Sequence, residues 1–404
     1  MAAPEREAGR LLVVVCVAFF CAGMMQGALG PALPDLAHQT GAGLVATGGM
    51  LTVIYLTALV GQTGAGLLIR RLGARRLLLT GMASFVPGIT GIATSTSLPM
   101  LLAASGLLGL GLGSVLLAGN VVAAEASSGA GPLNLVNAIF GLGAIVSPAL
   151  VGSSMIAFGS GLHALWSIPL GMILAAGLLL ARAPPPSAPL PDMAASPPQA
   201  PGLLAMLRAP TLLIIGIFMI GYMSQEVGLS TWLPTLLHRA TGLTLAMGAM
   251  AVSWFWLLMT AARFAAAWLS RFASPRAILR SCTGLCIAGS GLLWLGATTA
   301  SAPLGLAAVT ALGLGLGPIL PTMLALTRAF FPHNPGLAAG LVIGIGNIGG
   351  AAAPLILGGV IEARGAVQAT GLLLGAALAT ALVLVAIQRR NARTHYVRSQ
   401  PAQQ

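Results

Sequence analysis

The sequence contains very little charge and no lysine at all. Charged residues make up 6% of the 404 positions and hydrophobic residues 57%, whereas about a quarter of a soluble domain is charged so that its surface stays hydrated. A water-soluble globule is therefore excluded. All basic residues are arginine, and alanine, glycine and leucine are abundant, which is typical of a GC-rich bacterial genome. We therefore expect a protein of a bacterial inner membrane.

Patterns that bind metals, nucleotides or nucleic acid are also missing. The four cysteines lie inside apolar runs, and neither they nor the five histidines show the spacing of metal ligands. The glycine-rich strings lack the Lys-Ser or Lys-Thr pair of a phosphate-binding loop, so ATP-driven transport is not predicted. The net charge of +12 comes from arginines that lie mostly in the segments between the spans, so it is not a sign of a nucleic-acid partner. We expect no metal, no cofactor, no nucleic-acid partner and, because no catalytic cluster stands out, no enzymatic activity.

What the sequence does contain is a series of apolar runs that are long enough to cross a membrane. A transmembrane helix needs about 20 apolar residues to span a hydrocarbon core of ~30 Å. The runs predict an all-α membrane protein with twelve spans, at residues 11–36, 43–69, 77–95, 98–123, 132–157, 161–181, 209–237, 243–269, 277–298, 302–326, 336–361 and 366–388. The first run follows Arg6 and Arg10 and could pass for a signal peptide. Because eleven more runs follow it, we interpret it as the first span.

A proline-rich stretch divides these spans into two groups of six. Such a stretch cannot form a helix and has little to bury, so it is expected to be an extended linker. We predict an N-terminal six-helix bundle at 1–181, a cytoplasmic linker at 182–205, a C-terminal six-helix bundle at 206–388 and a tail at 389–404. If the N-terminus is cytoplasmic, most arginines fall on the cytoplasmic side, so the positive-inside rule predicts that both termini are cytoplasmic.

The two predicted bundles repeat each other. The string LGLGLG occurs twice, ending at Gly113 and at Gly317. A second pattern, Gly143, Pro148 and Gly152, recurs as Gly349, Pro354 and Gly358. Each match alone could simply reflect small residues that let helices approach closely, but the matches occur in order at a nearly constant offset. Two six-helix halves related by an axis along the membrane normal are the plan of major facilitator transporters, with the substrate site between the halves.

The segment after the second predicted span resembles the signature loop of the major facilitator superfamily. The matching residues are Gly66, Leu68, Arg71, Gly73, Arg75 and Arg76, and Arg70 stands where the family usually has Asp. The resemblance implies a cytoplasmic gating loop formed by Gly66, Arg70, Arg71, Gly73, Arg75 and Arg76. Without the acidic residue, the charge relay of this loop is incomplete. Ser105 stands where many drug/proton antiporters carry Arg, which argues against an efflux antiporter.

Four further segments are similar to the fucose/galactose/glucose symporter group of this superfamily. They are residues 134–148, 226–237, 254–264 and 313–322. This similarity implies a sugar as the solute. Two positions depart from the group: Asn137 stands where a His is common, and Gly27 replaces the acid that fucose permease uses in its first helix. Proton coupling through the first helix is therefore not implied.

One acidic residue, Glu226, lies well inside a predicted span. An ionised carboxylate there costs about 2.5–3.5 kcal/mol, so it normally faces a cavity or a partner. We predict that Glu226 binds solute or couples transport to an ion, the alternative being a carboxyl that only joins helices. Arg263 is the other ion within the spans. At 1.5 Å rise per residue its depth differs from that of Glu226 by about 17 Å, too far for a direct bridge, so we expect Arg263 to reach the inner interface or to bond loop carbonyls.

Recognition of a sugar requires amides and carboxyls for the hydroxyls and an aromatic ring for the C–H face. Besides Glu226, the candidates are Gln26, Asn120, Asn134, Asn137, Tyr222, Gln225, Trp256 and Asn347. Asn134 and Asn137 share one helix face, and Tyr222 lies one turn from Glu226. An amide within a span could instead join neighbouring helices. Trp232 is close to the predicted outer interface, where a place in the aromatic belt is favoured over stacking on a solute.

These observations predict a monomeric secondary transporter in the lipid bilayer. It would move a small polar solute, typically a sugar, by alternating access, with H⁺ or Na⁺ as the candidate coupling ion. The alternative is an exporter of small hydrophobic or anionic compounds, for which an intramembrane cation is needed and only Arg263 is available. A receptor or sensor is a further alternative, but it would need a soluble signalling domain or a long ordered tail, and the sequence predicts neither.

Overall fold

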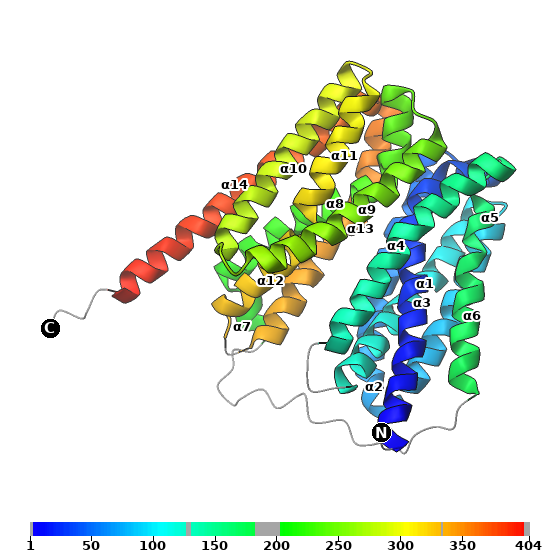
Figure 1. Ribbon diagram of the computed structural model, residues 1–404, viewed down its shortest axis with the longest axis horizontal. Coiled ribbons are helices and arrows are strands. Elements are labelled where there is room, and N and C mark those ends of the chain that lie inside the picture. The colour runs from blue at the N-terminus through cyan, green and yellow to red at the C-terminus, as the bar shows by residue number, and fades with distance from the viewer. Residues whose placement is uncertain (1–2, 127–130, 182–202, 333, 400–404) are drawn as a thin grey trace. The chain divides into compact units, whose positions relative to one another are not determined.

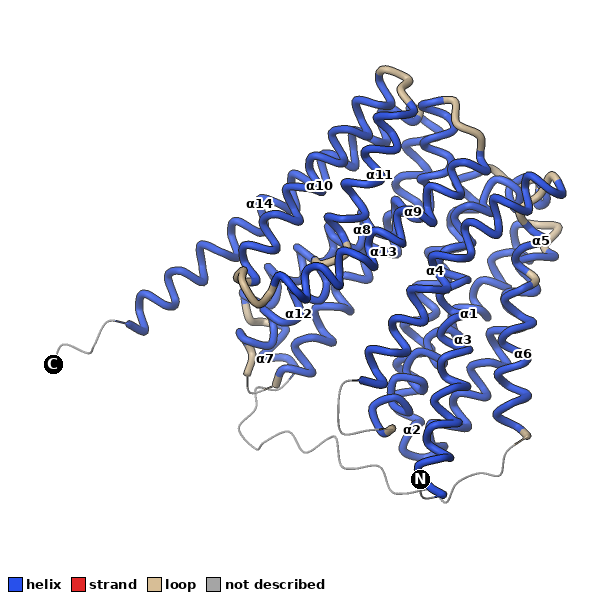
Figure 2. The backbone as a smooth tube through the Cα atoms, in the orientation of Figure 1, coloured by secondary structure: helices blue, strands red, loops and turns tan. Residues whose placement is uncertain are grey.

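The computed structural model describes residues 3–126, 131–181, 203–332 and 334–399, and every regular element in these ranges is a helix (Figure 2). Figure 1 gives their order along the chain. The helices are α1 (Ala3–Thr40), α2 (Leu44–Thr94), α3 (Leu98–Glu125), α4 (Gly131–Phe158), α5 (Leu162–Leu165), α6 (Ser167–Leu180), α7 (Leu203–Leu207), α8 (Pro210–Thr241), α9 (Leu245–Leu269), α10 (Pro275–Thr298), α11 (Ala302–Leu316), α12 (Ile319–Phe330), α13 (Pro335–Arg364) and α14 (Ala366–Ser399).

The prediction of twelve spans is confirmed. Within the described residues, twelve helical segments are long and apolar enough to cross a membrane, and they coincide with the predicted runs. The largest shift is at the third span, which begins at Arg71 instead of residue 77. Two spans share α2, whereas α5 with α6 and α11 with α12 each make one span between them.

The surface of these helices is largely apolar. Leu67, Phe264 and Leu382 are 76%, 68% and 72% exposed. A soluble protein rarely exposes many such side chains together, because contact between water and apolar surface is unfavourable. Hydrocarbon chains of a bilayer cover such a surface without that penalty, in agreement with the composition.

The expected loop between the second and third spans is a sharp bend. Helical structure runs through α2 except at Gly73, where φ is 77° and ψ is 156°. Glycine adopts a positive φ readily because it has no Cβ. Beyond the bend, Nη2 of Arg75 donates a hydrogen bond of 2.6 Å to the carbonyl of Leu179 near the end of α6. The second and third spans are therefore joined by a bend at Gly73 and not by a loop.

The first LGLGLG string brings α3 against both spans of α2. A Cβ on Gly109 would meet the backbone of Ile54, and one on Gly113 would meet the backbone of Ala58, both in the first span. A Cβ on Gly111 would meet Phe85 in the second span. Small residues permit such close backbone approach, so successive glycines of the string serve two different neighbours.

The second LGLGLG string is used in the equivalent way. Gly315 packs on Cys286 of α10, and Gly317 packs on the backbone of Met259 in α9. A similar equivalence holds elsewhere, because Gly143 of α4 packs on α1 and Gly349 of α13 packs on the backbone of Ile220 in α8. These matching contacts support the repeat that the sequence predicted.

The described residues form two compact units. The first contains the described residues up to 181 together with Ser230–Leu257 and Pro354–Ala363. The second contains the described residues of 203–229, 258–353 and 364–399. Three long helices, α8, α9 and α13, therefore each contribute one part to each unit. The predicted bundle boundaries stay a prediction, and most of the predicted linker, residues 182–202, lies outside the described part of the chain.

Candidate functional site

Glu226 lies near the middle of α8, in the part of this helix that belongs to the second unit. The residue is partly exposed, but its Oε2 atom is buried and, within the described part of the chain, completes no hydrogen bond. Leaving a buried polar atom without a partner costs about 1–3 kcal/mol, and more for a charged group. A carboxyl oxygen in this condition is suited to take up a proton or to accept a hydrogen bond from a solute.

Tyr222 and Arg263 flank the Glu226 carboxyl. Tyr222, one helical turn before Glu226, is fully buried, and its hydroxyl interacts with both Glu226 and Arg263. These approaches are loose, because the hydroxyl completes no hydrogen bond of full geometry within the described residues. Arg263, on α9, also attracts the Glu226 carboxyl electrostatically. The three side chains therefore form one cluster inside the second unit.

The predicted separation of Glu226 and Arg263 requires a correction. No direct ion pair between them is among the described contacts, as expected, but their charges do interact. The estimate from helical rise considered only the depths of the two backbones. It did not include the length of the arginine side chain or the hydroxyl of Tyr222, which reaches toward both groups.

Arg263 also bonds a backbone carbonyl at the point where a neighbouring span is interrupted, between α11 and α12. Its Nε donates a hydrogen bond of 3.1 Å to the carbonyl of Gly317, which lies between α11 and α12. Pro318 follows and has no backbone N–H, so the helix is interrupted at this point. Arg263 was expected to bond loop carbonyls or reach the inner interface, whereas the carbonyl that it bonds lies within the span Ala302–Phe330. The half-buried guanidinium thereby connects the break to the cluster around Glu226.

Gln225 is directed at α14 and not at the cluster. Its side chain is buried, and its Nε2 donates to the carbonyl of Gly221 at 3.3 Å and to Oγ1 of Thr380 at 3.5 Å. Its Oε1 is buried without a partner among the described residues. The role of a helix-joining amide, which the sequence left open for Gln225, fits these contacts. Asn347, on α13, is half-buried.

The first unit contains a second polar pair, formed by Gln26 of α1 and Tyr55 of α2. Nε2 of Gln26 donates a hydrogen bond of 2.7 Å to the Tyr55 hydroxyl, and both residues are partly exposed. Next to Gln26, a Cβ on Gly27 would lie 2.6 Å from Oγ of Ser147. That Oγ is buried without a hydrogen-bond partner in the described part of the chain. Ser147 therefore occupies the space that a side chain at position 27 would need.

The three predicted asparagines of the N-terminal half do not converge on this pair by any described contact. Asn134 and Asn137 are exposed, and Nδ2 of Asn137 donates 2.7 Å to the carbonyl of Leu133 on its own helix. Asn120 of α3 is half-buried. The shared face of Asn134 and Asn137 is present, but a hydrogen bond to the backbone of the same helix is a structural role.

Both predicted tryptophans are buried. Trp256 of α9 is 3% exposed and lies edge-on to Phe255, with ring centroids 5.9 Å apart. Trp232 of α8 is fully buried, and its Nε1 donates a hydrogen bond of 2.9 Å to the carbonyl of Pro354 in α13. The expected place of Trp232 in an interfacial belt is therefore wrong, because such a ring would lie at the surface.

The predicted gating residues surround the bend in α2. Gly66, Arg71 and Arg76 are exposed, Gly73 and Arg75 are half-buried, and the side chain of Arg70 lies outside the described part. The contact of Arg75 with Leu179 fixes one arginine, while Arg71 and Arg76 point to the surface. As a gating segment these residues remain a prediction.

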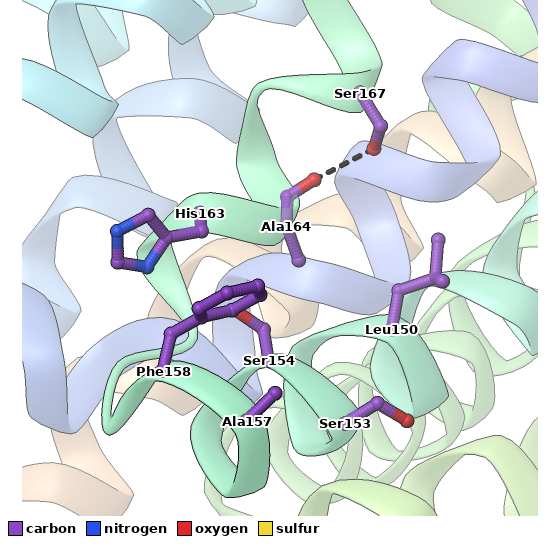
Figure 3. A pocket seen from close by; sticks show the side chains of 8 residues that line it. All are labelled: Leu150, Ser153, Ser154, Ala157, Phe158, His163, Ala164 and Ser167. Atoms are coloured by element: carbon purple, nitrogen blue, oxygen red, sulfur yellow. Dashed lines mark hydrogen bonds between the residues drawn. The ribbon is translucent and has the colours of Figure 1, made fainter.

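An apolar pocket of about 320 Å³ lies at the end of α4 in the first unit (Figure 3). The ring centroids of Phe158 and His163 lie 5.3 Å apart there with the ring planes tilted by 46°, and Ser167 donates to the Ala164 carbonyl at 2.6 Å. None of the residues lining this pocket was predicted as a site residue. The turn beside it is held by Asp35, whose Oδ2 accepts hydrogen bonds from the backbone N–H of Gly161 at 2.5 Å and from the Ser160 hydroxyl at 3.2 Å.

Sequence reasoning missed Tyr55 and favoured a structural role for Arg263. The chain has three tyrosines, and two of them, Tyr55 and Tyr222, lie inside spans beside another polar side chain. A phenolic hydroxyl in an apolar span usually finds a polar neighbour. A tyrosine inside a predicted span therefore indicates a polar site, and Tyr55 could have been identified in this way.

Comparison with known proteins agrees with this architecture. Residues 15–354 match the model of the Major Facilitator Superfamily. No curated protein matches the chain in sequence. Among solved structures, the nucleoside transporter NupG superposes with a TM-score of 0.74 at 14% identity over 94% of this chain and 98% of that chain, and a point mutant of NupG reaches 0.75. The human organic anion transporter MFSD10 (TETRAN) gives 0.66 at 20% identity over 95% and 100%.

At these identities the two solved structures establish the fold alone, whereas the family model matches most of the chain. The twelve helical spans fit that family. The chain therefore belongs to the major facilitator superfamily and is a multi-pass membrane transporter of small solutes, not an enzyme.

Proposed function

We propose that the protein moves a small neutral polyhydroxylated solute, such as a sugar or a nucleoside, by alternating access coupled to protons. The observation that carries this proposal is the Glu226 carboxyl, half-buried at mid-span with one oxygen buried and unpaired among the described residues. A carboxylate accepts hydrogen bonds from hydroxyl groups and repels anions. Neutral hydroxylated solutes are therefore the ligands that Glu226 favours.

The surroundings of Glu226 support the proposal of proton coupling. An ion at mid-span is costly, and protonation removes that cost. The positive charge of Arg263 attracts the ionised carboxylate. A conformational change that alters the distance between these groups would change the proton affinity of Glu226, which is the property a coupling residue needs.

The remaining parts of the proposal rest on other features of the chain. The Gln26–Tyr55 pair supplies an amide and a hydroxyl that can also bind solute hydroxyls. The similarity of fold to a nucleoside transporter is consistent with a solute of this class. From the arginine distribution we propose a bacterial inner membrane with both termini cytoplasmic, and we propose a monomer.

An organic anion is the second candidate solute. The guanidinium of Arg263 lies half-buried within the spans, and one of the similar structures is an organic anion transporter. However, its Nε is engaged by Gly317 and its charge is offset by Glu226. An anion would therefore have to displace an existing interaction.

Counterflow in proteoliposomes tests these proposals. Native protein is compared with Glu226→Gln for uptake of a hexose, a nucleoside and an organic anion, with and without an imposed pH gradient. If one proton moves with each solute, a gradient of one pH unit supports about tenfold accumulation, because one pH unit is worth 1.36 kcal/mol. Glu226→Gln should exchange solute but not accumulate it. Glu125→Gln, which removes a carboxyl outside the spans, is the matched control and should accumulate like native protein.

Each of the other outcomes is informative. Accumulation by Glu226→Gln equal to that of native protein contradicts a coupling role for this carboxyl. Transport of the organic anion but of neither neutral solute contradicts the proposed solute class and moves the second candidate to the front.

A further inference from the structure

Trp232 is held between two glycines of two other helices. A methyl group on Gly48 of α2 would lie 2.8 Å from Cζ2 of Trp232, and a methyl group on Gly358 of α13 would lie 2.6 Å from the same atom. Real Cβ atoms do not come this close to a ring, so both positions must be glycine while the indole stays in place. The hydrogen bond of 2.9 Å from Nε1 to the Pro354 carbonyl also ties the ring to α13.

A second contact joins the same two helices nearer to their ends. Oε1 of Glu362, in the last turns of α13, accepts a hydrogen bond of 3.2 Å from the backbone N–H of Val45, in the first turn of α2. The first N–H groups of a helix lack partners within that helix, and a carboxylate there is also favoured by the helix dipole. Gly43, the N-cap residue of α2, has no side chain that could cap the helix itself. Glu362, which lies on a helix remote in sequence, therefore caps the start of α2.

The backbone of α8 beside Trp232 also contacts α1. A Cβ on Gly30 would lie 2.8 Å from Cα of Thr231 and would meet the carbonyl oxygen of Ser230 as well. Thr231 is 4% exposed as a result. Parts of α1, α2, α8 and α13 thus meet in one dry contact within the first unit.

All of these contacts lie at one end of the spans. They involve the end of α1, the start of α2, the second half of α8 and the end of α13, and the arginine distribution predicts that this end faces outward. The segments of α8 and α13 that take part pack with the N-terminal helices, whereas the rest of each helix belongs to the second unit. Separation of α8 and α13 from α1 and α2 at this end would open the protein to the outside.

We propose that Trp232, seated between Gly48 and Gly358, together with the Glu362–Val45 hydrogen bond, forms a latch that holds the outer side of the transporter closed. Release of Trp232 from the two glycines is then the step that opens the outer side. Glu362 tethers α2 to α13 while the latch is shut, and Trp232 excludes water from the contact. The inference rests on transport by alternating access but not on any particular solute.

Cysteine labelling from the outside tests the latch. Thr231→Cys is introduced into a variant whose four native cysteines are replaced by serine, and a membrane-impermeant maleimide is added to right-side-out vesicles. Labelling should be slow while the latch is intact. Gly358→Ala should accelerate labelling about tenfold, which corresponds to ~1.4 kcal/mol and lies within the cost of inserting a methyl group into a packed contact.

Gly359→Ala is the matched control, because a methyl group on Gly359, the next residue of the same helix, would meet nothing within 4 Å. It should label as slowly as the parent. Glu362→Gln, whose side chain is exposed, should accelerate labelling about threefold, because it weakens a helix cap without disturbing the packed contact. If Gly358→Ala does not fold, the Glu362→Gln variant alone decides the test.

Three results would overturn the latch. Equal labelling rates for Gly358→Ala and Gly359→Ala would show that the fit of Trp232 does not control access. An acceleration that is equally large in inside-out vesicles would show general loosening and not an outer gate. No acceleration in Glu362→Gln would show that this hydrogen bond tethers nothing. Because the labelling needs no solute, these results are independent of whether the protein transports a sugar.

Discussion

Arg263 offers the sharpest test of the cluster in the second unit. Replacing it with Met, which has a similar length but no donor, removes the positive charge that attracts Glu226 and the donor that serves the Gly317 carbonyl. A partly buried carbonyl that loses its donor costs about 1–3 kcal/mol. Loss of the charge adds to this cost, because Glu226 is left as a single ion within the membrane. We therefore expect Arg263→Met to be destabilised by more than about 1 kcal/mol, the lower bound that the unpaired Gly317 carbonyl sets alone.

A double-mutant cycle separates the two contributions. Glu226→Gln together with Arg263→Met leaves the Gly317 carbonyl unpaired but no longer leaves a lone carboxylate. The double variant should therefore be more stable than the sum of the two single variants predicts, by about 0.5–3 kcal/mol. Thermal unfolding of the purified proteins in one detergent gives the four stabilities.

Arg263→Lys is the companion variant, because it keeps the charge but not the planar group whose Nε bonds Gly317. It should retain the coupling to Glu226 and lose the contribution of the Gly317 carbonyl. Additivity of Glu226→Gln and Arg263→Met within about 0.5 kcal/mol would refute the reasoning, since it would mean that the charges do not interact.

Two further predictions concern packing and the turn at Asp35. Gly111→Ala should lower the unfolding temperature, since its methyl group meets Phe85 of α2 and overpacking costs about 1–3 kcal/mol, whereas Gly64→Ala, with nothing within 4 Å, should be neutral or stabilising by up to about 1 kcal/mol. Equal unfolding temperatures for these two variants would contradict the packing argument. Asp35→Asn should destabilise by about 1–2 kcal/mol, because a neutral amide accepts the two hydrogen bonds of this turn less strongly, and faster proteolysis near Gly161 in the variant checks this.

The positions of the spans could be predicted because they depend on one local property. A run of about 20 apolar residues must cross the membrane as a helix whatever its neighbours are. The shift at the third span has a local cause as well: Arg71 to Arg76 are polar enough to suggest a loop, but a single positive φ at Gly73 lets the helix resume at once. Sequence patterns indicate that two spans are separated more easily than they indicate how many residues the connection uses.

The neighbours of each site residue could be predicted much less well. Helical rise gives the depth of Glu226 and Arg263, but the rotation of each helix and the reach of each side chain depend on tertiary packing. Trp232 shows the same limit, since its depth suggested an interfacial ring while glycines on two distant helices make room to bury it. Glu226 itself was identifiable, because an acid inside a span is rare and costly enough to be informative alone.

The alternating glycines of α3 have a consequence for biosynthesis. While the chain is being made, both spans of α2 leave the ribosome before α3, yet the surface on which both of them pack is the glycine string of α3. Until that string arrives, the two spans lack their principal partner and can only remain loosely paired in the lipid. The order of synthesis therefore makes residues 98–125 the segment that completes the first stable intermediate, and a nascent chain arrested before this segment should be far more sensitive to membrane proteases than one arrested after it.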